Sequence, residues 1–283
     1  MQIGVTFPQT EIGTDPIAIR DYAQAVQELG YSHIMIYDHV ICPGPTYPKE
    51  IAYSQQMFHE PFVLFGYLAA LTKLELVTAV VILPQRQTAL VAKQAAEVDM
   101  LTSGHIRLGV GVGWNQVEYE VLGTNFHARG RLIEEQIEVL RLLWSQPSVT
   151  YRGTFHTITD AGLNPLPVQR PIPIWMGGQA DVALRRIARL ADGWFPEETS
   201  AEAREPIERL RYYAQESGRD PDSIGIEGRV YARGSHLDNW IRQAEQWQAL
   251  GATHVSINTM GAGFISVNEH IEAIRNFRDA VTF

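Results

Sequence analysis

The stretch IRLGVGVGWNQVEYE, residues 106–120, indicates the fold. Its first half alternates valine and glycine as a buried strand does, and its second half is acidic and helix-like. The glycines follow the spacing G-x-G-x-G, whereas a dinucleotide-binding turn needs G-x-G-x-x-G at the start of a helix. We therefore expect the end of a strand and not a Rossmann turn. Its bare backbone either admits a ligand or makes room for bulky neighbours.

Strand-like and helix-like segments alternate on both sides of this stretch. The long apolar run at residues 74–83 is typical of a parallel strand buried on both faces. Helical stripes separate the strands, for example Ile133, Ile137, Leu140 and Trp144. The expected strands are residues 3–7, 33–37, 74–83, 106–112, 173–176, 193–195, 224–232 and 254–258.

These eight strand–helix units in 283 residues predict a closed (β/α)8 TIM barrel, with a doubly wound open sheet as the alternative. No linker is visible, so we expect a single domain over residues 1–283. Two insertions interrupt the alternation, at residues 41–58 after the second strand and at residues 149–171 between units four and five. The first insertion has the length of a lid, and its Tyr47, Tyr53, Met57 and Phe58 are candidates for a substrate wall.

Composition narrows the class of protein. Hydrophobic residues make up 45% of the chain, charged residues 19%, and the formal net charge is −9. No apolar run is long enough to span a membrane, and no basic cluster indicates nucleic acid binding. Cys42 is the single cysteine, which excludes an internal disulfide and a thiolate metal cluster. The N-terminus lacks a secretory pattern, so we expect a cytoplasmic protein.

In a TIM barrel the active site lies at the carboxyl ends of the strands. Asp38 and His39 follow the second strand, where His39 can exchange a proton near neutral pH and Asp38 can orient it or hold the turn. The alternative is a structural histidine. The remaining strand ends carry Pro8-Gln9, Pro84-Gln85, Gly111 to Asn115, Gly177 to Gln179, Pro196-Glu197, Arg233 and Asn258 to Gly263.

Other chemistries fit the pattern less well. The remaining histidines mostly miss the strand ends, so we predict no metal site, and Cys42 lacks the marks of a nucleophile. Gly177, Gly178 and Gln179 open a helix, where free backbone N–H groups bind phosphate well, or else form an ordinary tight turn. Trp114 either stacks near a ligand or packs in its loop. Glu60 and Glu118 either shape the pocket or are helix-start acids favoured by the dipole. Arg86 and Arg129 either meet anionic groups of a ligand or are solvated at the surface.

Three blocks of sequence resemble the luciferase-like family of flavin and deazaflavin oxidoreductases. They are YDHV (residues 37–40), LPQRQTALVAKQAAEVDMLTSGHIRLGVGVGWNQVEYEVLG (residues 83–123) and IPIWMGGQADVALRRIARLADGWFP (residues 172–196). The resemblance covers nearly the whole chain, and it is strongest to the subgroup that uses the deazaflavin coenzyme F420. FMN is the alternative cofactor.

The resemblance implies the arrangement of the site. The cofactor ring would lie against the backbone of Gly111, Val112 and Gly113, with a non-prolyl cis peptide behind it at Ala79-Val80. The phosphate would bind at Gly177 to Gln179, where many relatives carry a hydroxyl residue in place of Gln179. His39 would give or accept the proton that accompanies hydride transfer.

The lead hypothesis is therefore an F420-dependent oxidoreductase acting on a small organic substrate. An FMN monooxygenase that uses oxygen and a non-catalytic flavin-binding barrel are the alternatives. Relatives are often dimers, so a homodimer is a further expectation.

Overall fold

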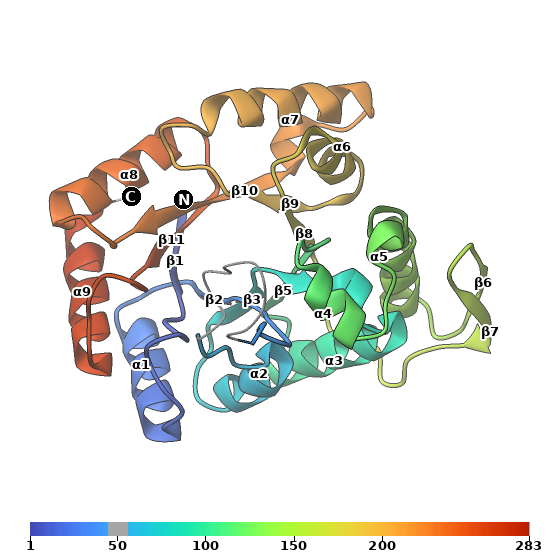
Figure 1. Cartoon of the computed structure of the whole chain (residues 1–283), viewed down its shortest axis with the longest axis horizontal. Coiled ribbons are helices and arrows are strands. Elements are labelled where there is room, and N and C mark those ends of the chain that lie inside the picture. The colour runs from blue at the N-terminus through green and yellow to red at the C-terminus, as the bar shows by residue number, and fades with distance from the viewer. Residues whose placement is uncertain (45–55, 283) are drawn as a thin grey trace.

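The computed structural model describes residues 1–44 and 56–282. Tyr47, Tyr53 and most of the first insertion lie outside the described residues. The strands pair in parallel around a closed ring, so the expected TIM barrel is confirmed and the open sheet is excluded (Figure 1). In ring order they are β1 (Gln2–Thr6), β2 (His33–Ile36), β3 (Glu75–Thr78), β5 (Ile106–Gly111), β8 (Ile174–Gly177), β9 (Gly193–Phe195), β10 (Gly225–Tyr231) and β11 (His254–Asn258), which pairs with β1.

The third strand differs from its prediction. A single strand was expected over residues 74–83, but the structure has β3 and then β4 (Val81–Ile82), both paired with β5. The peptide bond between Ala79 and Val80 is cis, as the resemblance implied, and it separates the two pieces. The prediction of one continuous strand was wrong because nothing in the apolar run marks this interruption.

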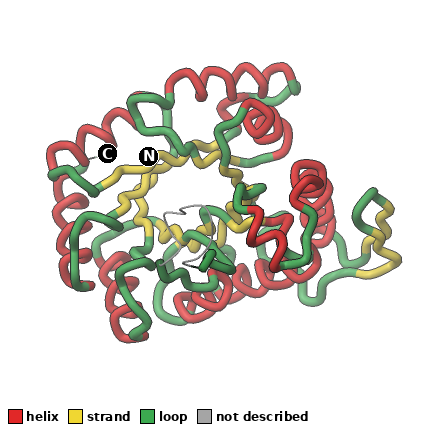
Figure 2. The backbone as a smooth tube through the Cα atoms, viewed as in Figure 1, coloured by secondary structure: helices red, strands yellow, loops and turns green. Residues whose placement is uncertain are grey.

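Helices surround the strands on the outside (Figure 2). They are α1 (Pro16–Glu28), α2 (Pro61–Ala69), α3 (Thr88–Leu101), α4 (Gln116–Val121), α5 (Arg129–Ser145), α6 (Asp181–Leu190), α7 (Arg204–Glu216), α8 (Leu237–Ala249) and α9 (Val267–Ala280), with short 3-10 turns at Leu83–Gln85, Phe126–Ala128 and Pro221–Ser223. In the described part of the chain, none of the helices is long and apolar enough to cross a membrane.

The insertion between units four and five forms an antiparallel hairpin, β6 (Val149–Arg152) and β7 (Thr157–Ala161), which projects from one side of the barrel (Figure 1). Glu135 on α5 anchors its turn by accepting backbone N–H groups from Thr154, Phe155 and His156 at 2.7–2.8 Å. The His156 ring contacts the Thr88 hydroxyl at 2.6 Å. The hairpin is thus tied to α5 and to the start of α3.

Glycines inside the strands make room for buried tryptophans. A Cβ on Gly228 would overlap the Trp247 indole, and a Cβ on Gly193 would overlap Trp175. The fully buried Trp247 donates its indole N–H to the Arg229 carbonyl at 3.0 Å. Its hydrogen bond is therefore satisfied in the core, and β10 is fixed at the point where Arg229 projects.

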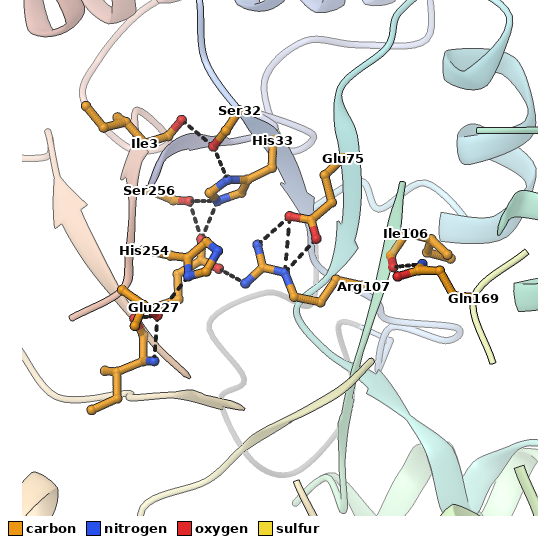
Figure 3. A network of polar contacts seen from close by, with 12 residues as sticks. Ile3, Ser32, His33, Glu75, Ile106, Arg107, Gln169, Glu227, His254 and Ser256 are labelled. Carbon is orange, nitrogen blue, oxygen red and sulfur yellow. Dashed lines mark hydrogen bonds and ion pairs between the residues drawn. The ribbon is translucent and has the colours of Figure 1, made fainter. Parts of the chain in front are cut away.

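A network of charged groups fills the barrel near the amino ends of the strands (Figure 3). The buried Glu227 on β10 contacts Nε2 of His33 at 2.6 Å and accepts Nη1 of Arg107 at 2.7 Å. Arg107 also pairs with Glu75 at 2.9 Å. Burial by itself raises the pKa of Glu227, but the charges of His33 and Arg107 prevail and hold it well below its ordinary value. This end of the barrel is therefore packed, and the opposite end is available for a site.

Candidate active site

A cavity of about 790 Å³ lies at the carboxyl ends of the strands. It is lined from β2, from the β3–β4 interruption, and from the ends of β5, β8, β9 and β10. The residues assigned from the sequence to catalysis or cofactor binding all line it: Asp38, His39, Ala79, Val80, Gly111, Val112, Gly113, Trp114, Gly177, Gly178 and Gln179. The structure thus brings the predicted residues together at the end of the barrel where the fold leads us to expect them.

A side chain at Gly109, Gly111 or Gly113 would meet a different neighbour in each case. A Cβ on Gly109 would overlap the Thr78 carbonyl and lie 2.7 Å from the Phe195 ring, so this glycine is required by packing. A Cβ on Gly111 would lie 2.7 Å from Val80, and one on Gly113 would lie 2.8 Å from Ile82. Val80 and Ile82 themselves line the cavity. Glycine at positions 111 and 113 therefore lets Val80 and Ile82 pack closely against the backbone at the cavity lining.

His39 faces a buried carboxylate. Its Nδ1 lies 3.0 Å from Oε1 of Glu118, whose side chain is only 3% exposed. The other carboxylate oxygen accepts Nε2 of the buried Gln85 at 3.2 Å. Glu118 therefore acts on His39 from α4, with Gln85 fixing its rotamer, and favours the ring tautomer that carries its proton on Nδ1. This tautomer directs an unprotonated Nε2 away from Glu118.

Asp38 has a different partner from the one considered in the sequence. Its two carboxylate oxygens accept Nη2 of Arg86 at 3.0 and 2.9 Å, and Arg86 Nη1 reaches Glu60 at 3.1 Å. Burial raises the pKa of Asp38, while the Arg86 charge acts in the opposite direction. Asp38 thus fixes the turn after β2, and Arg86 has a structural role as the partner of Asp38 and Glu60. Glu60 also caps α2 by accepting Val63 N–H at 2.8 Å.

The other end of the cavity offers hydrogen-bond donors. Gly178 has φ +127°, and α6 starts from Ala180 without a side-chain cap among the residues that the structure describes. Arg129 begins α5 and lines the same cavity. Its Nη1 donates to the Phe126 carbonyl at 2.8 Å, while its buried Nε has no hydrogen-bond partner in the described part of the chain. The start of α6 and the Arg129 guanidinium thus line the same cavity, and both are groups that favour an anion.

Two other residues considered in the sequence are placed clearly. Trp114 is 64% exposed and lines the cavity, so it lies at the mouth. Burial and the charge of Glu118 raise the pKa of Cys42, which disfavours the thiolate that a nucleophile would need.

Sequence reasoning missed the role of Arg229 and left Glu118 undecided. Arg229 and Tyr37 line the cavity from β10 and from the end of β2. Arg229 could have been noticed as a charged residue inside the apolar strand IGIEGRVYA, because charged side chains are rarely buried unless they are paired. The Glu118–His39 contact joins residues 79 positions apart, and no local pattern reveals such a pair.

The mouth of this parallel barrel thus combines the glycines at the end of β5, the start of α6 and a histidine held by a buried carboxylate. The family model for luciferase-like monooxygenases matches residues 1–275. The chain therefore belongs to the luciferase-like monooxygenase family, whose members are flavin- or F420-dependent oxidoreductases and monooxygenases.

Individual proteins are similar to this chain in sequence or in fold. An uncharacterized protein of Mycobacterium tuberculosis (strain ATCC 25618 / H37Rv) is 38% identical over 197 residues, covering 66% of this chain and 68% of the relative. An FMNH2-dependent dimethylsulfone monooxygenase of Pseudomonas fluorescens is 34% identical over 187 residues, covering 64% of this chain and half (50%) of the relative. The F420-dependent tetrahydromethanopterin reductase of Methanopyrus kandleri superposes with a TM-score of 0.79 at 15% identity, covering 99% and 98% of the two chains.

Proposed function

We propose that the protein is an F420-dependent oxidoreductase that moves a hydride between a small organic substrate and the deazaflavin ring. The observation that carries the proposal is the contact of His39 with the buried Glu118, because His39 lines the same cavity as Gly111 and Gly113. Hydride transfer to or from a carbonyl or alcohol carbon requires a matching proton transfer, and an oriented imidazole suits that task.

The residues of the cavity fit such a cofactor. Ala79, Val80, Gly111 and Gly113 present a surface with little side-chain bulk for the ring. Gly177, Gly178 and Gln179, with Arg129, would hold the phosphate. Bound F420 would supply the hydride acceptor or donor, and the protein would supply orientation, exclusion of water and a proton path.

His39 and Asp38 would divide the catalytic work. His39 would exchange the proton at Nε2 while Glu118 holds Nδ1. Asp38 would keep the turn after β2 rigid through Arg86, so that the imidazole stays at a fixed height above the barrel. Met57 and Phe58 would contribute to the substrate side, since the Phe58 ring lies 4.6 Å from the His39 ring, centroid to centroid.

FMN monooxygenation is the second candidate. The dimethylsulfone monooxygenase relative, 34% identical over 187 residues, favours it. Both activities would use the same wall and the same phosphate site, so the two candidates differ in cofactor and not in the placement of residues.

Equilibrium titration with each cofactor tests the proposal. We expect F420 to bind with a Kd at least about tenfold below that of FMN, a difference of about 1.4 kcal/mol. His39→Ala should retain F420 affinity and lose turnover. Tighter binding of FMN, with oxygen consumption by the reduced complex, would favour the second candidate. Failure to bind either cofactor would contradict both.

A further inference from the structure

The two sides of the cavity differ in chemistry. The side formed by β4, β5 and β8 is bare backbone and apolar, with Val80, Ile82 and Gly111. The side formed by β2 and β10 carries Tyr37, Arg229 and Tyr231. A planar cofactor ring needs only the apolar side, so the polar side is free to face a substrate bound in the same cavity.

Arg229 is the cation on this polar side. Its guanidinium carbon lies 5.4 Å from the centre of the Tyr37 ring, and its buried Nε has no hydrogen-bond partner among the described residues. The Tyr37 hydroxyl accepts Nδ2 of the buried Asn258 at 3.1 Å, which fixes the phenol. The backbone of Arg229 is held by Trp247 at 3.0 Å. Arg229 is thus held in place by Tyr37 and by the Trp247 contact to its backbone.

The nearby carboxylates have other partners. Glu227, two residues earlier on β10, is used by His33 and Arg107. Asp38 is used by Arg86, and Glu197 is exposed where it lines the cavity. Within residues 1–44 and 56–282, no carboxylate lies within ion-pairing distance of Arg229. Burial raises the pKa of Tyr37, so this phenol stays neutral and supplies no compensating charge.

The charge of Glu227 acts on Arg229 from two residues away, but a half-buried guanidinium without an ion pair in the described part of the chain is costly unless a ligand supplies one. We infer that Arg229 binds the anionic head group of the substrate, a carboxylate or a sulfonate, with Tyr37 and Tyr231 as flanking phenols. Planar oxyanions match the donor geometry of arginine. The inference rests on the proposed function, because it places the substrate anion across the cavity from the ring-binding wall. Arg129 would serve the cofactor phosphate, so the two arginines have separate ligands.

Binding of small anions to the cofactor-free protein and to the F420-loaded protein tests the inference. The probes are methanesulfonate with dimethyl sulfone as its neutral counterpart, and benzoate with benzamide, titrated by NMR at constant ionic strength. The variants are Arg229→Met, Arg229→Lys and the exposed control Arg233→Met. Arg129→Met serves as the cofactor-side control. Thermal unfolding confirms that each variant is folded.

We expect both anions to bind at least about tenfold more tightly than their neutral counterparts, as a charge-assisted hydrogen bond allows. Arg229→Met should remove that preference, Arg229→Lys should keep part of it, and Arg233→Met should leave it unchanged. Arg129→Met should weaken F420 binding without changing the anion preference.

The inference is overturned if Arg229→Met binds anions as the parent protein does, if anions and neutral counterparts bind equally, or if none binds below about 10 mM. It is also overturned if Arg229→Met weakens F420 at least about tenfold while anion binding persists, since Arg229 would then hold the cofactor. A protein that binds these anions through Arg229 but neither F420 nor FMN would contradict the proposed function and leave the anion site intact.

Discussion

The Glu118 carboxylate lies 3.0 Å from Nδ1 of His39, although α4 and the β2 turn are separated by 79 positions in the sequence. Since Gln85 holds the second oxygen of the same carboxylate, the orientation of the imidazole is set from outside its own loop.

Replacing Glu118 with glutamine should disturb that orientation. Loss of the charged acceptor weakens the bond to the Nδ1 proton, so the population of the Nδ1-protonated tautomer should fall. Nitrogen-15 NMR of the labelled His39 ring measures the population of each tautomer. The exposed Glu120→Gln on the same helix is the matched control and should leave the spectrum unchanged. Identical tautomer populations in the parent protein and in Glu118→Gln would show that Glu118 does not position His39.

Alanine substitutions should distinguish Gly109, which we expect to matter for stability, from Gly111, which we expect to matter for cofactor binding. Gly109→Ala meets the Thr78 carbonyl and should lower the free energy of unfolding by about 1–3 kcal/mol. Gly111→Ala meets Val80 in the cavity wall and should weaken cofactor binding at least about tenfold in a folded protein. Gly66→Ala in α2, where a Cβ meets nothing within 4 Å, is the control. Normal cofactor affinity in Gly111→Ala would argue against a ring at this wall.

The charged network inside the barrel should dominate stability. Glu227→Gln leaves Arg107 and His33 without their buried counter-charge, so we expect the free energy of unfolding to fall by about 3–5 kcal/mol. Glu75→Gln removes a partly exposed partner of the same arginine and should lower it by no more than about 1 kcal/mol. Urea titration measures both, and equal effects would contradict a special role for Glu227.

Acid should destabilise the fold through two buried groups, His254 and Glu227. Burial and the Arg107 charge lower the pKa of His254 from 6.5 to about 3 in the folded protein. Below pH 6.5 His254 therefore binds a proton in the unfolded chain but not in the folded protein, so stability falls as the pH falls. The lowered pKa of Glu227 has the same sign and acts below pH 4.5. The free energy of unfolding should therefore decrease continuously from pH 6.5 to pH 4.

Urea titrations at several pH values check this prediction. His254→Asn should flatten the slope between pH 6.5 and pH 5, and the exposed His127→Gln should not. A slope in that interval that is unaffected by His254→Asn would contradict the assignment.

The sequence predicts the barrel because each strand is apolar and each helix carries an apolar stripe. Strands at Gly193–Phe195 and His254–Asn258 have the predicted bounds. The split of the third strand was not visible in its residues, and only the family resemblance indicated the cis peptide at Ala79-Val80.

The site residues that could be predicted from the sequence are those whose location depends only on their position after a strand. His39, Gly111 and Gly177 follow strands, so the fold places them at one end. Pairing was not predictable, because Arg107 and Glu227 lie 120 positions apart and Glu118 reads equally well as a helix-start acid. Such contacts depend on the closure of the barrel, which no local pattern describes.

The central claim is that a planar redox ring rests on the backbone at the end of β5, beside His39. A crystal structure of the F420 complex tests it most directly. We expect the ring in van der Waals contact with Gly111 and the Ala79-Val80 peptide, and the cofactor phosphate at Gly178. A ring bound elsewhere, or a cavity wall at Gly111 that stays covered by side chains in the complex, would contradict it.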